Sequence, residues 1–290
     1  MPRLLIRELM DTLANPDGMF CSLKAVEPFC DLRGEPIFVS GNASVVFKIR
    51  CEEQTCALKC YTDHLDNLAE RYSFVAALRS PIACRVNFLP DEVMVFSHNR
   101  FCFTDAVLMP WLQGRTLDFA IRSAVHKGDC GSFERLASAF DLFAARLLSE
   151  QWAHGDLKPE NIVVAADGQM SLVDFDSLYA PCLDSRGAVG TPLYTHPKRT
   201  AADYSKLLDG YGIALLALML HALAADPSLC KEVSADGVLF QPDAVLCGND
   251  HSFVRVAELF AHDERMTGLC SVLTSPLPLT DVRHLFPNRE

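Results

Sequence analysis

The chain has 290 residues, half of them hydrophobic and 22% charged, a composition typical of a folded globular protein rather than a disordered one. Its net charge of −11 at pH 7 argues against a dedicated nucleic-acid-binding protein, because such proteins present a basic surface to phosphates. A nucleotide substrate is still compatible with this charge, since a few local cations and magnesium are enough to hold a triphosphate.

The first residues lack the apolar core of a signal peptide, and the most apolar run, residues 210–225, is shorter than a membrane span. We therefore expect a cytoplasmic chain with no membrane partner, in which this run forms a buried helix. The twelve cysteines are scattered, so we expect reduced thiols.

Cys51, Cys56 and Cys60 are the most closely spaced cysteines. If residues 54–61 form a strand, alternation puts Cys56 and Cys60 on one face and predicts that Cys51 lies on the other. This arrangement favours small core residues over a metal site.

The first third of the chain is predicted to be rich in strands, because β-branched and apolar residues alternate there between turn residues. The predicted strand segments are 36–51, 54–62, 91–97 and 101–110. The last two form a hairpin that turns at residues 98–100. A helix is predicted over residues 66–80, since its apolar residues recur at helical spacing.

After Trp111 the pattern changes to helices, and this shift is the candidate lobe boundary. A long helix is predicted over residues 132–153, with Ser132 as its N-cap. Two short strands, 161–165 and 170–175, follow it. A loop then leads to the apolar helix after Asp209, and further helices fill the remainder.

The stretch HGDLKPEN (residues 154–161) and the later VDFD (173–176) resemble the protein-kinase superfamily in motif, spacing and order. The resemblance covers roughly residues 36–267. It implies an α+β bilobal fold with a β-rich small lobe and a helical large lobe. More narrowly, short strings such as ALKCYT and TPLYTHPKR resemble bacterial Ser/Thr kinase-like proteins. The implied boundaries are an N-terminal extension (1–34) and a kinase-like domain (35–290) with N-lobe 35–109, hinge 110–114 and C-lobe 115–290.

Phosphoryl transfer needs positioning and charge neutralisation more than covalent chemistry, and the resemblance assigns those tasks to five residues. Asp156 would orient the attacking hydroxyl and accept its proton, and Lys158 would offset charge on the γ-phosphate. Asn161 and Asp174 would supply oxygen ligands for magnesium. Thr191 would hydrogen-bond near Asp156 and Lys158, in a loop that seats a protein substrate.

The resemblance also implies a nucleotide site for ATP. Lys59 would hold the α- and β-phosphates, and a carboxylate of the following helix would orient it. Glu70 is the candidate for that carboxylate, with Asp66 as a rival and a solvated surface role as the alternative. The remaining predicted contacts with the nucleotide are Gly41, Ser44, Val46, Ala57, Met109, Pro110 and Leu112.

Several positions depart from the family pattern. Gly155 replaces the Arg before the catalytic Asp and removes a receiver for an activation-loop phosphate, so phosphorylation of Ser185 or Thr191 is predicted to be unnecessary. Asp176 replaces the Gly of the D-F-G motif. Val39 and Ser44 replace two glycines of the phosphate loop.

Two further positions concern the framework of the loop. Lys198 stands where the family has a Glu that pairs with an Arg, here Arg265. We expect either that one of these two cations faces solvent or that another carboxylate intervenes. Asp209 matches a helix Asp that braces the catalytic loop, and His154 is predicted to be structural.

Three functions are compatible with these motifs. The leading one is an ATP- and magnesium-dependent Ser/Thr protein kinase acting on a protein substrate. The second is a catalytically weak kinase-like binding or scaffold module, suggested by the eroded phosphate loop. The third is a small-molecule kinase of the aminoglycoside or choline type, whose motifs also read HGD and DFD. The physiological substrate and the oligomeric state do not follow from the residues.

Overall fold

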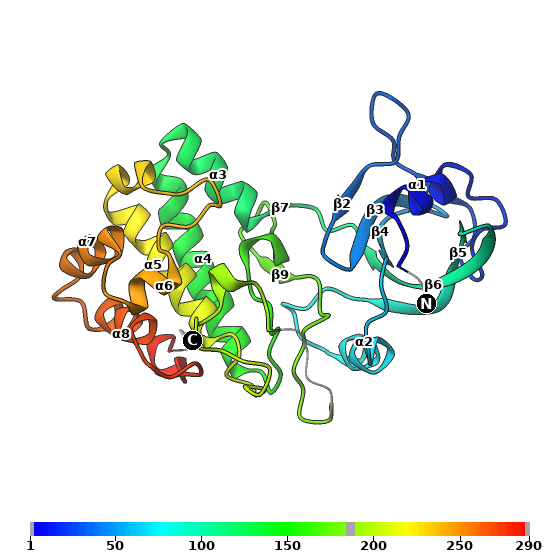
Figure 1. Ribbon diagram of the computed structural model, residues 1–290. Helices are drawn as coiled ribbons and strands as arrows, with labels where there is room; N and C mark the ends of the chain where they lie inside the picture. Colours follow the sequence, from blue (N-terminus) through cyan, green and yellow to red (C-terminus); the bar gives the residue numbers. More distant parts are fainter. Residues whose placement is uncertain (1–2, 184–188, 288–290) are drawn as a thin grey trace. The chain divides into compact units, whose positions relative to one another are not determined.

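The computed structural model describes residues 3–183 and 189–287. These residues fall into two compact units that divide after Leu112 (Figure 1). The first unit is an antiparallel sheet with two helices, and the second is mainly helical. Each unit is described by itself below.

The sheet of the first unit has the strand order β1-β3-β4-β6-β5, and β2 pairs with the first half of β3. The elements of this unit are α1 (Ile6–Ala14), β1 (Val26–Pro28), β2 (Phe38–Ser40), β3 (Ser44–Cys51), β4 (Gln54–Tyr61), α2 (Leu68–Ala77), β5 (Asn87–Ser97) and β6 (Arg100–Pro110). The predicted β5–β6 hairpin is confirmed. The predicted strand segment 36–51 is divided by a turn into β2 and β3.

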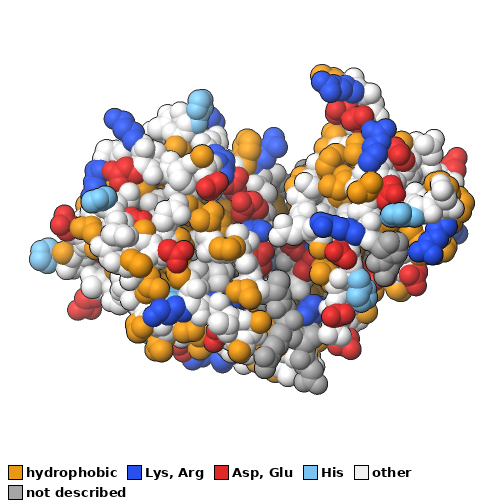
Figure 2. Space-filling model, in the orientation of Figure 1, with side chains coloured by type: hydrophobic (Ala, Val, Ile, Leu, Met, Phe, Trp, Pro, Cys, Tyr) orange, Lys and Arg blue, Asp and Glu red, His pale blue; other side chains and the backbone are white. Residues whose placement is uncertain are grey.

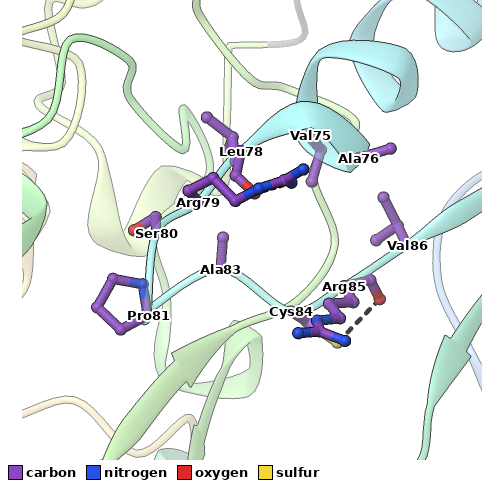
Figure 3. A pocket seen from close by; sticks show the side chains of 10 residues that line it. All are labelled: Val75, Ala76, Leu78, Arg79, Ser80, Pro81, Ala83, Cys84, Arg85 and Val86. Carbon is purple, nitrogen blue, oxygen red and sulfur yellow. Dashed lines mark hydrogen bonds between the residues drawn. The ribbon is translucent and has the colours of Figure 1, made fainter.

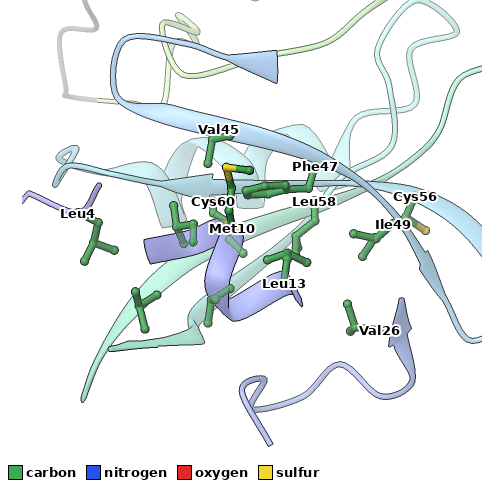
Figure 4. Close-up of a cluster of buried hydrophobic side chains, with 14 residues drawn as sticks. Leu4, Met10, Leu13, Val26, Val45, Phe47, Ile49, Cys56, Leu58 and Cys60 are labelled. Carbon is green, nitrogen blue, oxygen red and sulfur yellow. The ribbon is translucent and has the colours of Figure 1, made fainter. Parts of the chain in front are cut away.

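The N-terminal segment shares its core with the sheet. Helix α1 buries Leu9 and Leu13 completely against side chains of β3 and β4, among them Phe47 and Leu58 (Figure 4). Strand β1 extends the sheet by pairing with β3. Burial of these apolar side chains is what stabilises a short helix that would be marginal alone.

A buried carboxylate fastens the same segment to β5. Glu92 is 2% exposed and accepts hydrogen bonds from the Ser22 amide at 2.9 Å, the Ser22 hydroxyl at 2.6 Å and the Leu23 amide at 2.8 Å. A buried charge needs such partners to offset its lost hydration. These bonds therefore specify where the N-terminal segment crosses β5.

The predicted placement of Cys51 is wrong. The register pairs Cys51 with Gln54 and Ile49 with Cys56, and residues opposite each other share a face. Cys51 and Cys56 therefore lie on the same face, and Cys51 packs against the core cluster that contains Cys56. Alternation cannot be counted through the turn at residues 52–53, because the chain reverses there and Glu52 has a left-handed φ of 55°.

The connection between β1 and β2, residues 29–37, projects from the sheet (Figure 1). Its two arms are joined by the bridge between Cys30 and Pro36. Leu32 at the tip is fully exposed, with a relative exposure of 107%. The space-filling view shows hydrophobic, basic and acidic side chains at this projection (Figure 2).

The second unit contains the long helices and a small three-stranded sheet in the order β7-β8-β9. Its strands and α-helices are β7 (Arg115–Thr116), α3 (Leu117–Lys127), α4 (Cys130–Ser149), β8 (Ile162–Val164), β9 (Met170–Leu172), α5 (Gly210–Ala225), α6 (Pro242–Leu246), α7 (His251–Leu259) and α8 (Glu264–Leu273). Its 3-10 helices are η1 (Pro159–Asn161), η2 (Pro192–Tyr194), η3 (Pro227–Lys231) and η4 (Arg283–Leu285).

Helix α5 is buried on nearly all sides, which confirms the prediction for residues 210–225. Among the residues that the structure describes, no helix combines the length and the apolar character needed to cross a bilayer. The predicted N-cap of α4 is wrong: Asp129 caps this helix by accepting a hydrogen bond from the Ser132 amide. An Asp three residues before a Ser is an equally good cap, so the local pattern allowed both.

Candidate active site

In the first unit, one face of the sheet gathers predicted nucleotide-binding residues. Val46 lies opposite Lys59, and Ala57 lies opposite Met109, so all four side chains share a face. The intervening residues, such as Leu58, point to the α1 core on the other side. The register thus separates a core face from a candidate nucleotide face.

Lys59 is 1% exposed, and its Nζ lies 5.2 Å from the centre of the Tyr61 ring. A buried ammonium group is costly unless it is partnered. Glu70, the predicted partner on α2, is exposed, and Asp66 pairs with His64 at 3.3 Å. The pairing of Lys59 with either carboxylate stays a prediction.

The predicted phosphate loop is the turn between β2 and β3. The Gly41 amide donates to the Ser44 carbonyl at 2.8 Å, which closes the turn. Val39, at the position of a lost glycine, is 69% exposed. At the predicted hinge, Pro110 ends β6 opposite Cys56, and Leu112 closes the first unit.

In the second unit, a group that we call the catalytic-loop cluster consists of Asp156, Lys158, Asn161 and Thr191. Asp156 Oδ1 accepts a hydrogen bond from the Thr191 amide at 2.6 Å, and Asp156 Oδ2 lies 3.3 Å from Lys158 Nζ. Lys158 also donates to the Thr191 hydroxyl at 3.1 Å. The structure therefore brings together the three residues predicted to be catalytic.

The predicted magnesium ligands lie at the base of the β8–β9 hairpin. Asn161 is 5% exposed, and its side-chain amide donates to the Asp156 carbonyl at 3.0 Å, so the carboxamide oxygen is the atom that could act as the predicted metal ligand. The Val173 amide donates to the Asn161 carbonyl at 3.0 Å, and Asp174 follows with a left-handed φ of 67°. Two such oxygens suit magnesium, which takes one or two protein ligands plus phosphates.

Among the described residues, no group of three or more His, Cys, Asp or Glu side chains could hold a metal by itself.

A buried aspartate braces the loop from below. Asp209 is 5% exposed and accepts hydrogen bonds from the amides of His154 at 2.6 Å and Gly155 at 2.8 Å. Burial raises the pKa of the Asp209 carboxyl, against the influence of His154, these two amides and Arg199. His154 Nε2 lies 2.9 Å from the Val173 carbonyl, so its ring joins the catalytic loop to the segment before Asp174.

Gly155 is required by its surroundings. It has a φ of +81°, and a Cβ atom there would lie 2.1 Å from the Ser177 carbonyl oxygen. Gly190, next to Thr191, approaches the same backbone, and a Cβ atom there would lie 2.9 Å from the Gly155 carbonyl oxygen. Two chain segments thus pack against the backbone immediately before Asp156.

Both predicted outcomes for the cations Lys198 and Arg265 are found: another carboxylate pairs with Arg265, and Lys198 faces solvent. Asp141 on α4 forms a two-pronged ion pair with Arg265, with one bond of 2.8 Å and a second, shorter one. His221 Nε2 lies 3.0 Å from the same carboxylate. Lys198 is exposed. Asp141 belongs to no motif. The only sequence signal for it is that Lys198 replaces the glutamate with which Arg265 would otherwise pair.

A cavity of about 760 Å³ lies in the first unit at the end of α2, and the described residues that line it fall within positions 75–86 (Figure 3). Arg79 and Arg85 border it, and the Cys84 thiol donates to the Arg85 carbonyl at 3.3 Å. None of the predicted site residues belongs to this stretch. The sheet face of the first unit and the catalytic-loop cluster of the second unit are therefore treated as two separate candidate sites.

No family model matches the chain. A search of curated proteins finds the probable cAMP-dependent protein kinase catalytic subunit of Encephalitozoon cuniculi (strain GB-M1), which is 29% identical over 117 residues. The match covers 38% of this chain and 35% of that protein, so it spans about a third of the relative's length. It supports a relationship to protein kinases at the level of the superfamily.

This relationship agrees with the coarse features of the molecule. The antiparallel sheet and the helical region are compatible with a kinase-like fold. Phosphorylation of Ser185 or Thr191 is predicted to be unnecessary, and of these two residues Ser185 lies outside the described residues.

Proposed function

We propose that this chain transfers the γ-phosphoryl group of ATP, with magnesium, to a Ser or Thr hydroxyl of a protein substrate, with Asp156 as the catalytic base. The observation that carries the proposal is the arrangement around Asp156. Its carboxylate is held by the Thr191 amide and by Lys158, and is still partly exposed to an incoming hydroxyl.

The chemistry divides among the residues of the cluster. Asp156 orients the acceptor hydroxyl and takes its proton as the new P–O bond forms. Lys158, held by Asp156 and Thr191, carries the positive charge that offsets charge on the transferring group. Because these contacts exist before a substrate binds, little reorganisation is needed during the reaction.

The nucleotide-facing residues complete the proposal. Lys59 would hold the α- and β-phosphates, and Asn161 and Asp174 would ligate magnesium. The metal, when bound, would neutralise charge on the phosphates. Burial of Lys59 at 1% exposure supports a role at a site that is closed to water.

A protein substrate is favoured over a small molecule by the loop that carries Thr191. Its amide and hydroxyl both contact the catalytic-loop residues, so the segment around η2 is built into the site. A second candidate function, a catalytically weak binding module, is favoured by one observation: Val39 and Ser44 stand where two loop glycines would allow close approach to phosphate.

Purified protein with magnesium, radiolabelled ATP and generic protein substrates tests the proposal. We expect label transfer by the wild type, and a loss of at least about 100-fold in Asp156→Asn and in Lys59→Met. Matched controls are Asp167→Asn in the exposed β8–β9 turn and Lys24→Met, both exposed, which should transfer label normally.

Aminoglycosides and choline serve as competing acceptors in the same assay. Label on these compounds but not on protein would replace the proposed substrate class with a small molecule. Nucleotide binding without transfer to any acceptor would favour the binding module.

A further inference from the structure

Arg199 lies in the segment that follows η2, next to the exposed Lys198, and no role is predicted for it from the sequence. Its Nη2 donates to the Gly155 carbonyl at 3.1 Å. That carbonyl belongs to the peptide bond that joins Gly155 to Asp156. Because a peptide group is planar, a hydrogen bond to this oxygen fixes the orientation of the peptide plane that contains the Asp156 amide and Cα atom.

Gly155 is thereby held at both ends. Its amide donates to Asp209 at 2.8 Å, and its carbonyl accepts from Arg199. A glycine at φ +81° has the freest backbone of any residue, so restraint has to come from its neighbours. Asp209 and Arg199 provide that restraint from opposite sides of one residue.

The charge around Arg199 favours this position. Burial lowers the pKa of its guanidinium, while the carboxylates of Asp209, Asp156 and Asp203 act in the opposite direction. Its Nε is buried, with no hydrogen-bond partner among the described residues. A buried donor without a partner is destabilising, so the nearby carboxylates and the bond to Gly155 have to offset this cost.

The segment that carries Arg199 is itself anchored at both ends. His196 is 3% exposed, its Nδ1 accepts from the Lys198 amide at 3.0 Å, and its Nε2 lies 2.9 Å from the Ser275 carbonyl. On the other side, Asp203 accepts from the Thr200 amide at 2.8 Å and from the Thr200 hydroxyl at 3.0 Å. The backbone of Arg199 is therefore fixed before its side chain reaches Gly155.

We infer that Arg199 is a positioning residue that holds the Gly155–Asp156 peptide for phosphoryl transfer, so that the loop after η2 supplies the cation that position 155 lacks. No phosphate is needed in this arrangement, since three carboxylates already surround the guanidinium. The inference rests on the proposed function for its catalytic readout.

The inference is tested in the full chain with three variants: Arg199→Lys, Arg199→Met and the matched control Lys198→Met. We expect Arg199→Met to lower kcat for phosphoryl transfer about 10- to 100-fold, the range for a lost hydrogen bond to a charged group. The KM for ATP should stay within about 2-fold, because Arg199 acts on the Asp156 peptide and not on the predicted nucleotide contacts. Arg199→Lys should recover most of the loss, and Lys198→Met should match the wild type.

Hydrogen exchange of the peptide that covers residues 152–158 gives a readout that does not depend on activity. Exchange should be faster in Arg199→Met than in the wild type and unchanged in Lys198→Met. An Arg199→Met protein with wild-type kcat and wild-type exchange would overturn the inference, as would an Arg199→Lys protein as impaired as Arg199→Met. A wild type that transfers no phosphate but shows the exchange difference would refute the proposed function and leave Arg199 as the brace of this peptide.

Discussion

Gly155 and Ser177 approach each other so closely that a Cβ atom at position 155 would lie 2.1 Å from the Ser177 carbonyl oxygen. Real Cβ atoms do not come this near to backbone oxygen, so the loop before Asp156 and the segment after Asp174 can pack in this way only with glycine. The glycine at this position, where the protein-kinase pattern has an arginine, is thus required by packing.

Gly155→Ala is therefore expected to be strongly destabilising. Left-handed φ alone costs about 1–2 kcal/mol for a residue with a Cβ, and the clash adds to this cost. Gly168→Ala is the matched control, because Gly168 has a φ of +86° and its nearest potential contact is 4.0 Å away. In urea unfolding, Gly155→Ala should lose at least about twice the free energy that Gly168→Ala loses. Equal losses would show that the Ser177 segment moves aside.

Asp141 should make a pH-dependent contribution to stability. Burial acts to raise the pKa of its carboxyl, but the hydrogen bonds from His221 and Arg265 outweigh burial, and the pKa is lowered. A lowered pKa means that the contribution is complete above the unfolded-state value of about 3.9 and disappears as the pH falls through the folded-state value.

Asp141→Asn is accordingly expected to reduce the free energy of unfolding by about 2 kcal/mol at pH 7. The difference from the wild type should be constant between about pH 7 and 5 and should shrink below about pH 4. Urea titrations over this pH range measure the difference in the free energy of unfolding. The control is Glu258→Gln, which changes an exposed carboxylate of α7. A difference that grows as the pH falls would contradict the assignment.

Glu92 should determine how firmly the N-terminal segment is held. Glu92→Gln removes the charge that receives two amides and a hydroxyl, at an expected cost of about 2 kcal/mol. Limited trypsin digestion measures the loosening of this segment locally, because the exposed Lys24 lies just after the anchored residues. Cleavage there should be faster than in the wild type or in Glu53→Gln, whose carboxylate is exposed. An unchanged rate of cleavage would mean that the α1 core alone holds the segment.

Thr191 should act through its hydroxyl and without phosphorylation. Thr191→Val removes the bond from Lys158 but keeps the amide bond to Asp156, so we expect kcat to fall about 10-fold, with recovery in Thr191→Ser. Thr191→Asp places a second carboxylate beside Asp156 and should be less active still. A phosphatase-treated wild type should keep its activity, and an increase in the activity of Thr191→Asp would contradict this account.

Local patterns were sufficient for much of the fold. The continuous apolar run of α5, the alternation of β4 and the turn of the β5–β6 hairpin are properties of neighbouring residues, so they could be predicted directly. The spacing within residues 154–161 likewise confines Asp156, Lys158 and Asn161 to one loop.

Features that depend on distant contacts could not be predicted in this way. The face of Cys51 depends on how the chain reverses at Glu52, and the cap of α4 on a choice between Asp129 and Ser132. The reason for Gly155 is the Ser177 carbonyl, 22 residues later in the chain. Arg199 reaches the loop only because the segment after η2 returns to it.

Phosphoryl transfer by Asp156→Asn, measured beside nucleotide binding, tests the central claim most directly. We predict that the variant binds ATP with magnesium within about 2-fold of the wild type but transfers phosphate to protein at least about 100-fold more slowly. The reason is that the proposed metal ligands Asn161 and Asp174 are left intact while the proposed proton acceptor is lost. Equal transfer rates for the wild type and Asp156→Asn would contradict the account.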